Sequence, residues 1–195
     1  SGDIIVLKDG VDHDLDGNQF AFSKPITILG SGADNAALLT NGTASITADN
    51  VTIEGIRVAV GDSETALTID GDNAVVKDVS FVGDGDPTAA TAIAVTASTD
   101  SFTITSSDFN GVTTAIALPS DYTATGSIVG NTIANSATGI AVDGLTNDAN
   151  LTIDDNTLVA NTAAIELAGT YTENAEISVE GNLFSVGNSA TGVDA

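Results

Sequence analysis

The chain has 195 residues, of which 42% are hydrophobic, and this length and composition suit a single folded domain with a sizeable core. Only 4 Lys and Arg residues stand against 27 Asp and Glu residues, which gives a formal net charge of −23. So acidic a surface repels phosphate backbones and anionic lipids, and we therefore expect neither nucleic-acid binding nor membrane binding. It suits calcium or another divalent cation, and a saline medium.

The chain contains no Cys, Met or Trp. Without cysteine there is no disulfide, no thiol chemistry and no thiolate zinc site, so stability has to come from packing and hydrogen bonds. The chain starts at Ser1 rather than Met, so we expect a processed product or an excised segment without a signal peptide or a membrane span. The lack of oxidisable side chains favours an extracellular or cell-surface location.

The opening segment, residues 1–32, predicts a strand at Ile4–Leu7, a turn-rich stretch, and two strands around Phe20–Phe22 and Ile26–Leu29. The turn-rich stretch has the spacing D-x-D-x-D-G of the first half of a calcium-binding loop, with Asp12, Asp14, Asp16 and Asn18 as candidate ligands. Ser23 stands where such a loop places a bidentate Glu. The alternative is an acidic turn between two strands, in which His13 is solvated.

From residue 33 onward, two columns of apolar residues recur together at intervals of about 23 to 28 residues, which is the range of solenoid proteins. Each apolar run is three to five residues long, alternates with period two and is bounded by Gly, Asn, Asp or Ser, as expected of strands. The first column contains Ile53, Val76, Ile104, Ile128, Ile153 and Val179, and the second contains Leu67, Ile93, Ile116, Ile140, Ile165 and Val193.

These columns predict one all-β domain over residues 1–195, in which three short strands form each coil and about seven to eight coils stack in parallel. The repeats, of the form ITI-x-x-N-x-I/L/F followed by GIAV or AIEL, resemble the right-handed parallel β-helix of the pectate-lyase-like superfamily from Ile26 onward. This superfamily includes lyases, hydrolases, epimerases, tailspikes, adhesins and structural modules, so the resemblance implies a fold without implying an activity.

One cluster looks like part of an enzyme. Glu54 and Lys77 occupy the same outward position on adjacent coils, with Arg57 close by. Lyases and epimerases of the superfamily use basic side chains to neutralise a uronate and to abstract a proton, so the resemblance implies these residues as the catalytic candidates. The alternative is a surface ion pair of small energetic value. The catalytic patterns of polygalacturonases and epimerases are otherwise absent from the sequence.

Two further acidic positions are candidate cation sites. Asp84 and Asp86 lie in a Gly- and Pro-containing loop, and Asp154 is expected to stack over Glu180 on the next coil, about 5 Å away. The alternative is that these carboxylates are solvated without a cation, and we favour this alternative for Asp154 and Glu180. The two tyrosines, Tyr122 and Tyr171, are placed in loops, where they pack over a corner of the coil or stack on a sugar ring.

The later coils place Asn131, Asn156 and Asn182 at one bend position, where Ile56, Val79 and Ser107 stand in earlier coils. Carboxamides one coil apart can each donate to one neighbour and accept from the other, so we predict a structural ladder at this bend. Asn41, Asn50 and Asn150 lie in Asn-x-Thr sequons and are possible glycosylation sites.

The last repeat is expected to stop partway through a coil, at Thr191–Ala195, and to leave the C-terminal end uncapped. An uncovered coil exposes apolar side chains and strand edges, so another copy or a further part of a longer chain is expected to cover it. We therefore expect a non-enzymatic extracellular structural solenoid, either self-stacking into a filament or forming a stalk or adhesin segment of a surface protein. The alternatives are a carbohydrate-active protein related to polysaccharide lyases or epimerases, and a module that binds calcium or a glycan.

Overall fold

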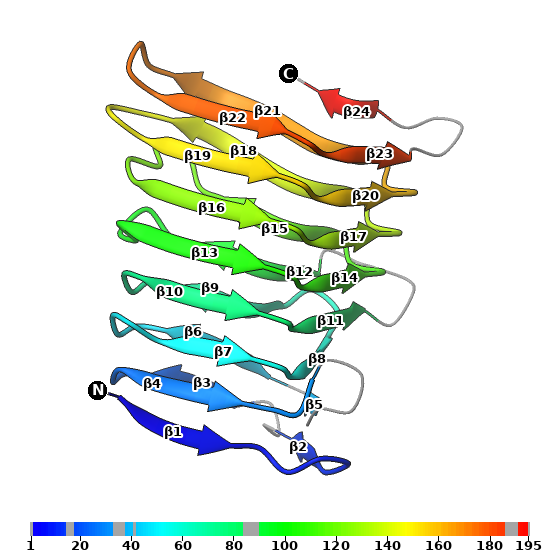
Figure 1. Ribbon diagram of the computed structural model, residues 1–195. Helices are drawn as coiled ribbons and strands as arrows, with labels where there is room; N and C mark the ends of the chain where they lie inside the picture. The colour runs from blue at the N-terminus through cyan, green and yellow to red at the C-terminus, as the bar shows by residue number, and fades with distance from the viewer. Residues whose placement is uncertain are drawn as a thin grey trace.

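The computed structural model describes residues 2–14, 18–32, 38–40, 42–83, 90–185 and 191–194. The chain winds into an elongated solenoid whose coils stack along one axis, with the N-terminus at one end and the C-terminus at the other (Figure 1). Each coil contributes one strand to each of three parallel sheets, and every sheet has 8 strands. Among the described residues there is no helix long and apolar enough to cross a membrane.

We call the three sheets A, B and C. Sheet A contains β1 (Asp3–Val6), β4 (Ile26–Leu29), β7 (Thr52–Glu54), β10 (Ala74–Lys77), β13 (Ser101–Thr105), β16 (Thr125–Val129), β19 (Asn150–Asp154) and β22 (Glu176–Glu180). Sheet B contains β2 (Asp12–Asp14), β5 (Leu38–Thr40), β8 (Arg57–Val60), β11 (Ser80–Gly83), β14 (Asp108–Asn110), β17 (Thr132–Ala134), β20 (Thr157–Val159) and β23 (Leu183–Ser185). Sheet C contains β3 (Gln19–Phe22), β6 (Thr43–Ile46), β9 (Thr65–Ile69), β12 (Thr91–Val95), β15 (Thr114–Leu118), β18 (Thr138–Leu145), β21 (Ala163–Tyr171) and β24 (Thr191–Asp194).

Both predicted columns are confirmed by the strand register. In sheet A, Val76 pairs with Ile53 on one side and with Ile104 on the other, and the column continues to Val179. In sheet C, Ile93 pairs with Leu67 and Ile116, and that column runs to Val193. The prediction of three parallel strands per coil is therefore correct. The period-two alternation of apolar residues fixes which face of each strand is buried, and the buried face in turn specifies the register.

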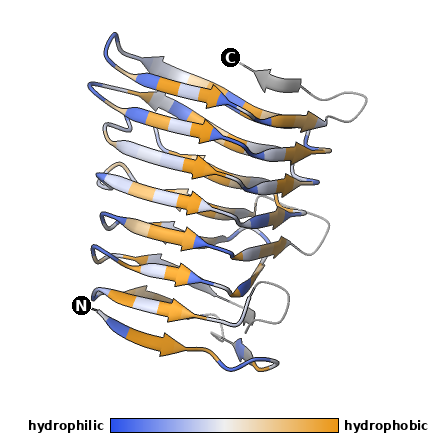
Figure 2. Ribbon diagram, viewed as in Figure 1, coloured by the Kyte–Doolittle hydropathy of each residue, from blue (hydrophilic) through white to orange (hydrophobic). Residues whose placement is uncertain are grey.

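The core is a narrow stack of apolar side chains between the sheets. Apolar bands recur at the same place on successive strands of Figure 2. Ile104, Ile128 and Ile153 are fully buried on the inner face of sheet A, whereas Thr103 and Thr152, which precede Ile104 and Ile153 in the same strands, remain partly exposed. On the inner face of sheet B, Phe81 and Phe109 stack with their ring centroids 4.9 Å apart and their planes 3° apart. Regular burial of this kind supplies most of the stability of a protein that lacks disulfides.

Two features of the fold differ from the sequence prediction. Residues 12–14, expected in a turn, form strand β2, which pairs with Leu38–Thr40 of β5. Tyr171, expected in a loop, is the last residue of the long strand β21. In each case, pairing with the neighbouring coil imposes strand structure on a segment whose own sequence predicts it only weakly.

The long strands β18 and β21 contain an irregularity between Val142 and Gly144, where the register shifts by one residue. Gly169 has a φ of +81°, and a Cβ at this position would lie 2.1 Å from the carbonyl oxygen of Asp143. A residue with a side chain would therefore force the two strands apart. Beyond this bulge the extended ladder brings Tyr171 beside Leu145, so sheet C is wider in these coils than in the earlier ones.

Candidate functional site

The bend between sheets A and B has the same backbone form in six consecutive coils. Its first residue has a positive φ in every case, and this residue is Gly55, Asp78, Ser106, Gly130, Asp155 or Gly181. Gly, Asp and Asn tolerate this left-handed conformation better than most residues. The second residue of the bend then points inward, and this is the position of Ile56, Val79, Ser107, Asn131, Asn156 and Asn182.

The predicted Asn ladder is confirmed at this second position. Asn131 Nδ2 donates to Asn156 Oδ1 at 3.0 Å, and Asn156 Nδ2 donates to Asn182 Oδ1 at 3.0 Å. Asn156 Oδ1 also accepts the backbone N–H of Asn131, and Asn182 Oδ1 accepts the backbone N–H of Asn156, both at 2.9 Å. Each carboxamide therefore satisfies backbone groups at a buried bend that no strand can pair.

A second, shorter ladder at the bend between sheets B and C was missed by the sequence analysis. The residues Asn135 and Ala160 have positive φ, and the residues that follow them are the buried Ser136 and Asn161. Asn161 Oδ1 accepts the backbone N–H of Ser136 at 2.9 Å, and Asn161 Nδ2 donates to the carbonyl of Ile133 at 2.9 Å. The 25-residue separation of Ser136 and Asn161, equal to that of Asn131 and Asn156, was the available signal.

The enzyme-like cluster contains one ion pair. Lys77 and Glu54 are register partners on β10 and β7, and Lys77 Nζ lies 2.6 Å from Glu54 Oε1. The hydrogen bond to Glu54, and after it the charge of Glu54, raise the pKa of the Lys77 amine above its usual value. Arg57 is exposed on the neighbouring sheet B, and no ion pair joins it to Glu54 within the described part of the chain. The three side chains lie on an open flank of the solenoid.

The structure describes some of the other candidate acidic residues, and the rest lie outside the described ranges. Asp154 and Glu180 are in register as predicted, and Asp154 Oδ1 accepts the backbone N–H of Glu180 at 3.0 Å. Asp12 and Asp14 belong to β2, and Asn18 precedes β3. Asp16, Asp84, Asp86 and the sequon residue Asn41 lie outside the described residues. No group of three or more His, Cys, Asp or Glu side chains within the described ranges is arranged to hold a metal ion.

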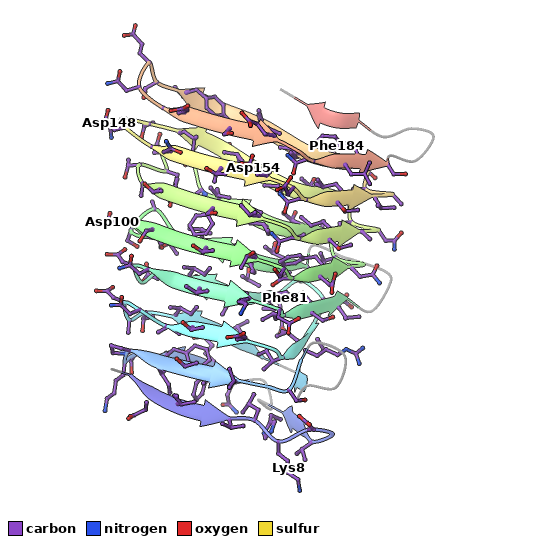
Figure 3. All side chains as sticks on the ribbon, viewed as in Figure 1. Lys8, Phe81, Asp100, Asp148, Asp154 and Phe184 are labelled. Carbon is purple, nitrogen blue, oxygen red and sulfur yellow. The ribbon has the colours of Figure 1, made fainter. Side chains whose placement is uncertain are left out.

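Asp carboxylates also bind backbone groups from coil to coil at the exposed corner between sheets C and A. The backbone N–H of Asp72 donates to Asp49 Oδ1 at 3.1 Å, and that of Asp100 donates to Asp72 Oδ1 at 2.6 Å. Figure 3 shows Asp100 and Asp148 at this outer edge, pointing away from the core. The same corner carries the sequon residues Asn50 and Asn150, both exposed. These acids have a structural use that needs no ligand.

The two tyrosines differ in environment. Tyr122 is fully buried against Phe102, and its hydroxyl group has no hydrogen-bond partner. Burial, followed by the charges of Asp100 and Asp72, raises the pKa of Tyr122. Tyr171 is 39% exposed and donates from its hydroxyl to the carbonyl of Val142 at 3.1 Å. The prediction that Tyr122 packs at a corner of the coil is therefore confirmed.

This contrast predicts opposite results for the two Tyr→Phe variants. Tyr122→Phe removes an unpaired buried hydroxyl and should leave stability unchanged or raise it by about 1 kcal/mol, whereas Tyr171→Phe should lose about 1 kcal/mol. Because the pKa of Tyr122 is higher when folded than when unfolded, the protein should lose stability as the pH rises above about 10, and Tyr122→Phe should weaken this loss. Urea unfolding of both variants at pH 7 and pH 11 measures these effects.

The two ends of the solenoid differ from its flanks. At the N-terminal end, Ile4 is 66% exposed and Val6 is 70% exposed. The same end has an open apolar cavity with a volume of about 170 Å³, which is lined by Ile5, Leu7, His13, Phe20, Phe22, Ile28 and Ala44. At the C-terminal end, Leu183 is 62% exposed and Phe184 is only partly buried, although the equivalent Leu158 one coil earlier is fully buried. Apolar surface is therefore concentrated at both ends.

Three parallel sheets wound from short strands around one continuous core define a β-solenoid protein. The family model described as "Right handed beta helix region" matches residues 4–194, so the chain belongs to the right-handed β-helix family. Searches of curated proteins and of solved structures found no match. Membership of this family accounts for the coils, the columns and the bends, and it assigns neither a ligand nor a reaction to the chain.

Proposed function

We propose that this right-handed β-helix domain is a non-enzymatic extracellular structural element that stacks end to end into a filament, or that serves as a stalk or adhesin segment of a surface protein. The observation that carries the proposal is the exposure of apolar side chains and strand edges at both ends of the solenoid. Exposed edges of this kind readily pair with another chain, and terminal coils of soluble solenoids normally carry a polar cap. The acidic, cysteine-free composition supports the extracellular location.

Electrostatics should control this association. Each copy carries a formal charge of −23, so copies repel one another at low ionic strength. The Debye length falls from about 30 Å at 0.01 M salt to about 3 Å at 1 M, which removes most of the repulsion between exposed charges. We therefore expect sedimentation velocity to detect monomers in 0.01 M NaCl and large assemblies in 1 M NaCl or with millimolar calcium. Monomers under all of these conditions would argue against self-stacking.

A matched pair of variants separates the ends from the flank. Leu183 and Thr132 belong to the same outward column of sheet B, but Leu183 lies on the last coil and Thr132 lies two coils earlier. Leu183→Asp places a charge at the end and should block assembly, whereas Thr132→Asp adds the same charge to the exposed flank and should leave assembly intact. Equal effects of the two variants would show that net charge alone controls association.

The alternative function, action on an acidic polysaccharide, depends on Glu54, Arg57 and Lys77. The exposed 2.6 Å pair of Lys77 and Glu54 supports a surface ion pair, because a cleft or a positioned third group would be needed to orient a substrate. We expect Lys77→Ala to change stability by less than about 1 kcal/mol and to leave the products of incubation with uronate polymers unchanged. Cleavage or epimerisation that is lost in Lys77→Ala would favour the enzyme instead.

A further inference from the structure

The corner between sheets C and A carries a line of carboxylates in the interior coils of the solenoid. The register of β7, β10 and β13, continued back to this corner, aligns Asp72 with Asp49 of the coil before it and with Asp100 of the coil after it. Register partners in adjacent coils are about 5 Å apart, so Asp72 has one like charge on each side. Like charges at directly opposed positions destabilise the pairing of strands.

The same carboxylates also hold this corner closed. Asp49 Oδ1 accepts the backbone N–H of Asp72, and Asp72 Oδ1 accepts the backbone N–H of Asp100. Backbone bonds accompany them, because the N–H of Asn50 donates to the carbonyl of Asp72 at 2.8 Å and the N–H of Thr125 donates to the carbonyl of Asp100 at 3.1 Å. The acids therefore cannot turn away from one another into water without losing the hydrogen bonds that close the corner.

No cation of the described chain is paired with these three acids. The nearest cation in register is Lys24, one coil before Asp49, and it forms no ion pair within the described ranges. The negative charge of the corner also reaches the core, because the charges of Asp100 and Asp72 add to the effect of burial and raise the pKa of Tyr122. Ions in the solvent are therefore the main means of reducing the repulsion between the acids.

We infer that this corner makes the folded solenoid sensitive to ionic strength: it opens at low salt and closes when salt screens the three carboxylates. The Debye length is about 30 Å at 0.01 M salt, far longer than the spacing between coils, and about 3 Å at 1 M, which is shorter than that spacing. Salt therefore weakens the repulsion between neighbouring acids more than it weakens the short hydrogen bonds that close the corner. The inference concerns the folding of one chain and does not rest on stacking between copies.

The variant Asp72→Asn tests this inference, because it removes the central charge and keeps an oxygen that can accept the N–H of Asp100. In 0.01 M NaCl, we expect the corner amides of Asn50 and Thr125 to exchange on the order of tenfold more slowly in this variant than in the natural chain. In 1 M NaCl the difference should fall to about twofold or less, because the charges are screened. Hydrogen exchange followed by NMR over a series of NaCl concentrations measures both values.

Asp108→Asn is the matched control for this variant. It makes the same change of charge on the exposed flank of sheet B, where the register partners of Asp108 are the uncharged Ser80 and Thr132. Because Asp108 has no like charge beside it in the column, its neutralisation should leave exchange at the corner as it is in the natural chain at every salt concentration. The two variants have the same net charge, so a difference between them depends on position alone.

Three outcomes would overturn the inference. If Asp72→Asn and Asp108→Asn slow exchange equally, net charge controls opening and the corner does not. If the corner of the natural chain exchanges at the same rate in 0.01 M and 1 M NaCl, the fold is not sensitive to ionic strength. If millimolar calcium protects the corner and magnesium at the same concentration does not, a selectively bound cation acts in place of screening. Sedimentation of the same samples measures assembly separately, so a failure of self-stacking would leave this test unaffected.

Discussion

Replacing Asn156 with Ala should destabilise the protein by about 2 to 5 kcal/mol. The substitution removes the oxygen that accepts the backbone N–H of Asn131 and the amide that donates to the carbonyl of Ile128. Both backbone groups are buried at a tight bend, and leaving one such group without a partner costs about 1 to 3 kcal/mol. Because coils contact only their neighbours, the loss should be concentrated in the coils that contain Asn131, Asn156 and Asn182.

Urea unfolding monitored by circular dichroism measures the overall change, and hydrogen exchange locates it. Asn110→Ala is the matched control, because the side chain of Asn110 is exposed and accepts one hydrogen bond from Asn135 at 2.8 Å. This control should change stability by no more than about 0.5 kcal/mol. If Asn156→Ala costs no more than Asn110→Ala, the ladder does not stabilise the bends.

Replacing Phe109 with Ala should cost about 3 to 5 kcal/mol. Phe109 is 1% exposed, and its ring stacks on Phe81, so the truncated side chain leaves a cavity that the flat, regular sheets cannot easily close. Hydrogen exchange should increase most in β11, β14 and β17, which are adjacent in sheet B. The result depends on packing alone, because no polar group is left unpaired.

Phe20→Ala is the control for this substitution. Phe20 has the same side chain, but it is 47% exposed at the N-terminal end. Its ring meets that of Phe22 edge to face, with the ring centroids 4.9 Å apart. We expect less than half of the loss seen for Phe109→Ala, measured by the same urea titration. An equal loss at both positions would show that the end coil is packed as tightly as the interior, against the account of an open end.

Much of the architecture could be predicted from the sequence because every coil of a solenoid repeats the same arrangement of strands and bends. Period-two alternation fixes the buried face, and the repeat length fixes which residues of successive coils are neighbours, so the columns of Ile53 and Leu67 and the pair of Glu54 and Lys77 followed directly. The Asn ladder followed from the same alignment and from the hydrogen-bonding capacity of a carboxamide.

The remaining features depend on pairing or burial that one segment does not reveal. The segment Asp12–Asp14 has no apolar alternation and is a strand only because β5 lies beside it. The burial of Tyr122 depends on the corner that Phe102 and the bridge to Leu145 create. The extension of β21 to Tyr171 depends on a bulge that requires Gly169. Each of these is set by the neighbouring coil, and local propensity is overridden there.

The most direct test of end-to-end stacking is cryo-electron microscopy of the protein in 1 M NaCl. Strands in adjacent coils are spaced about 4.8 Å apart, so eight coils per copy predict unbranched fibres with a strong axial spacing near 4.8 Å and a subunit repeat of about 38 Å. Calcium chelation should leave these fibres intact if salt screening alone permits assembly. Particles that remain single solenoids about 38 Å long would contradict the account.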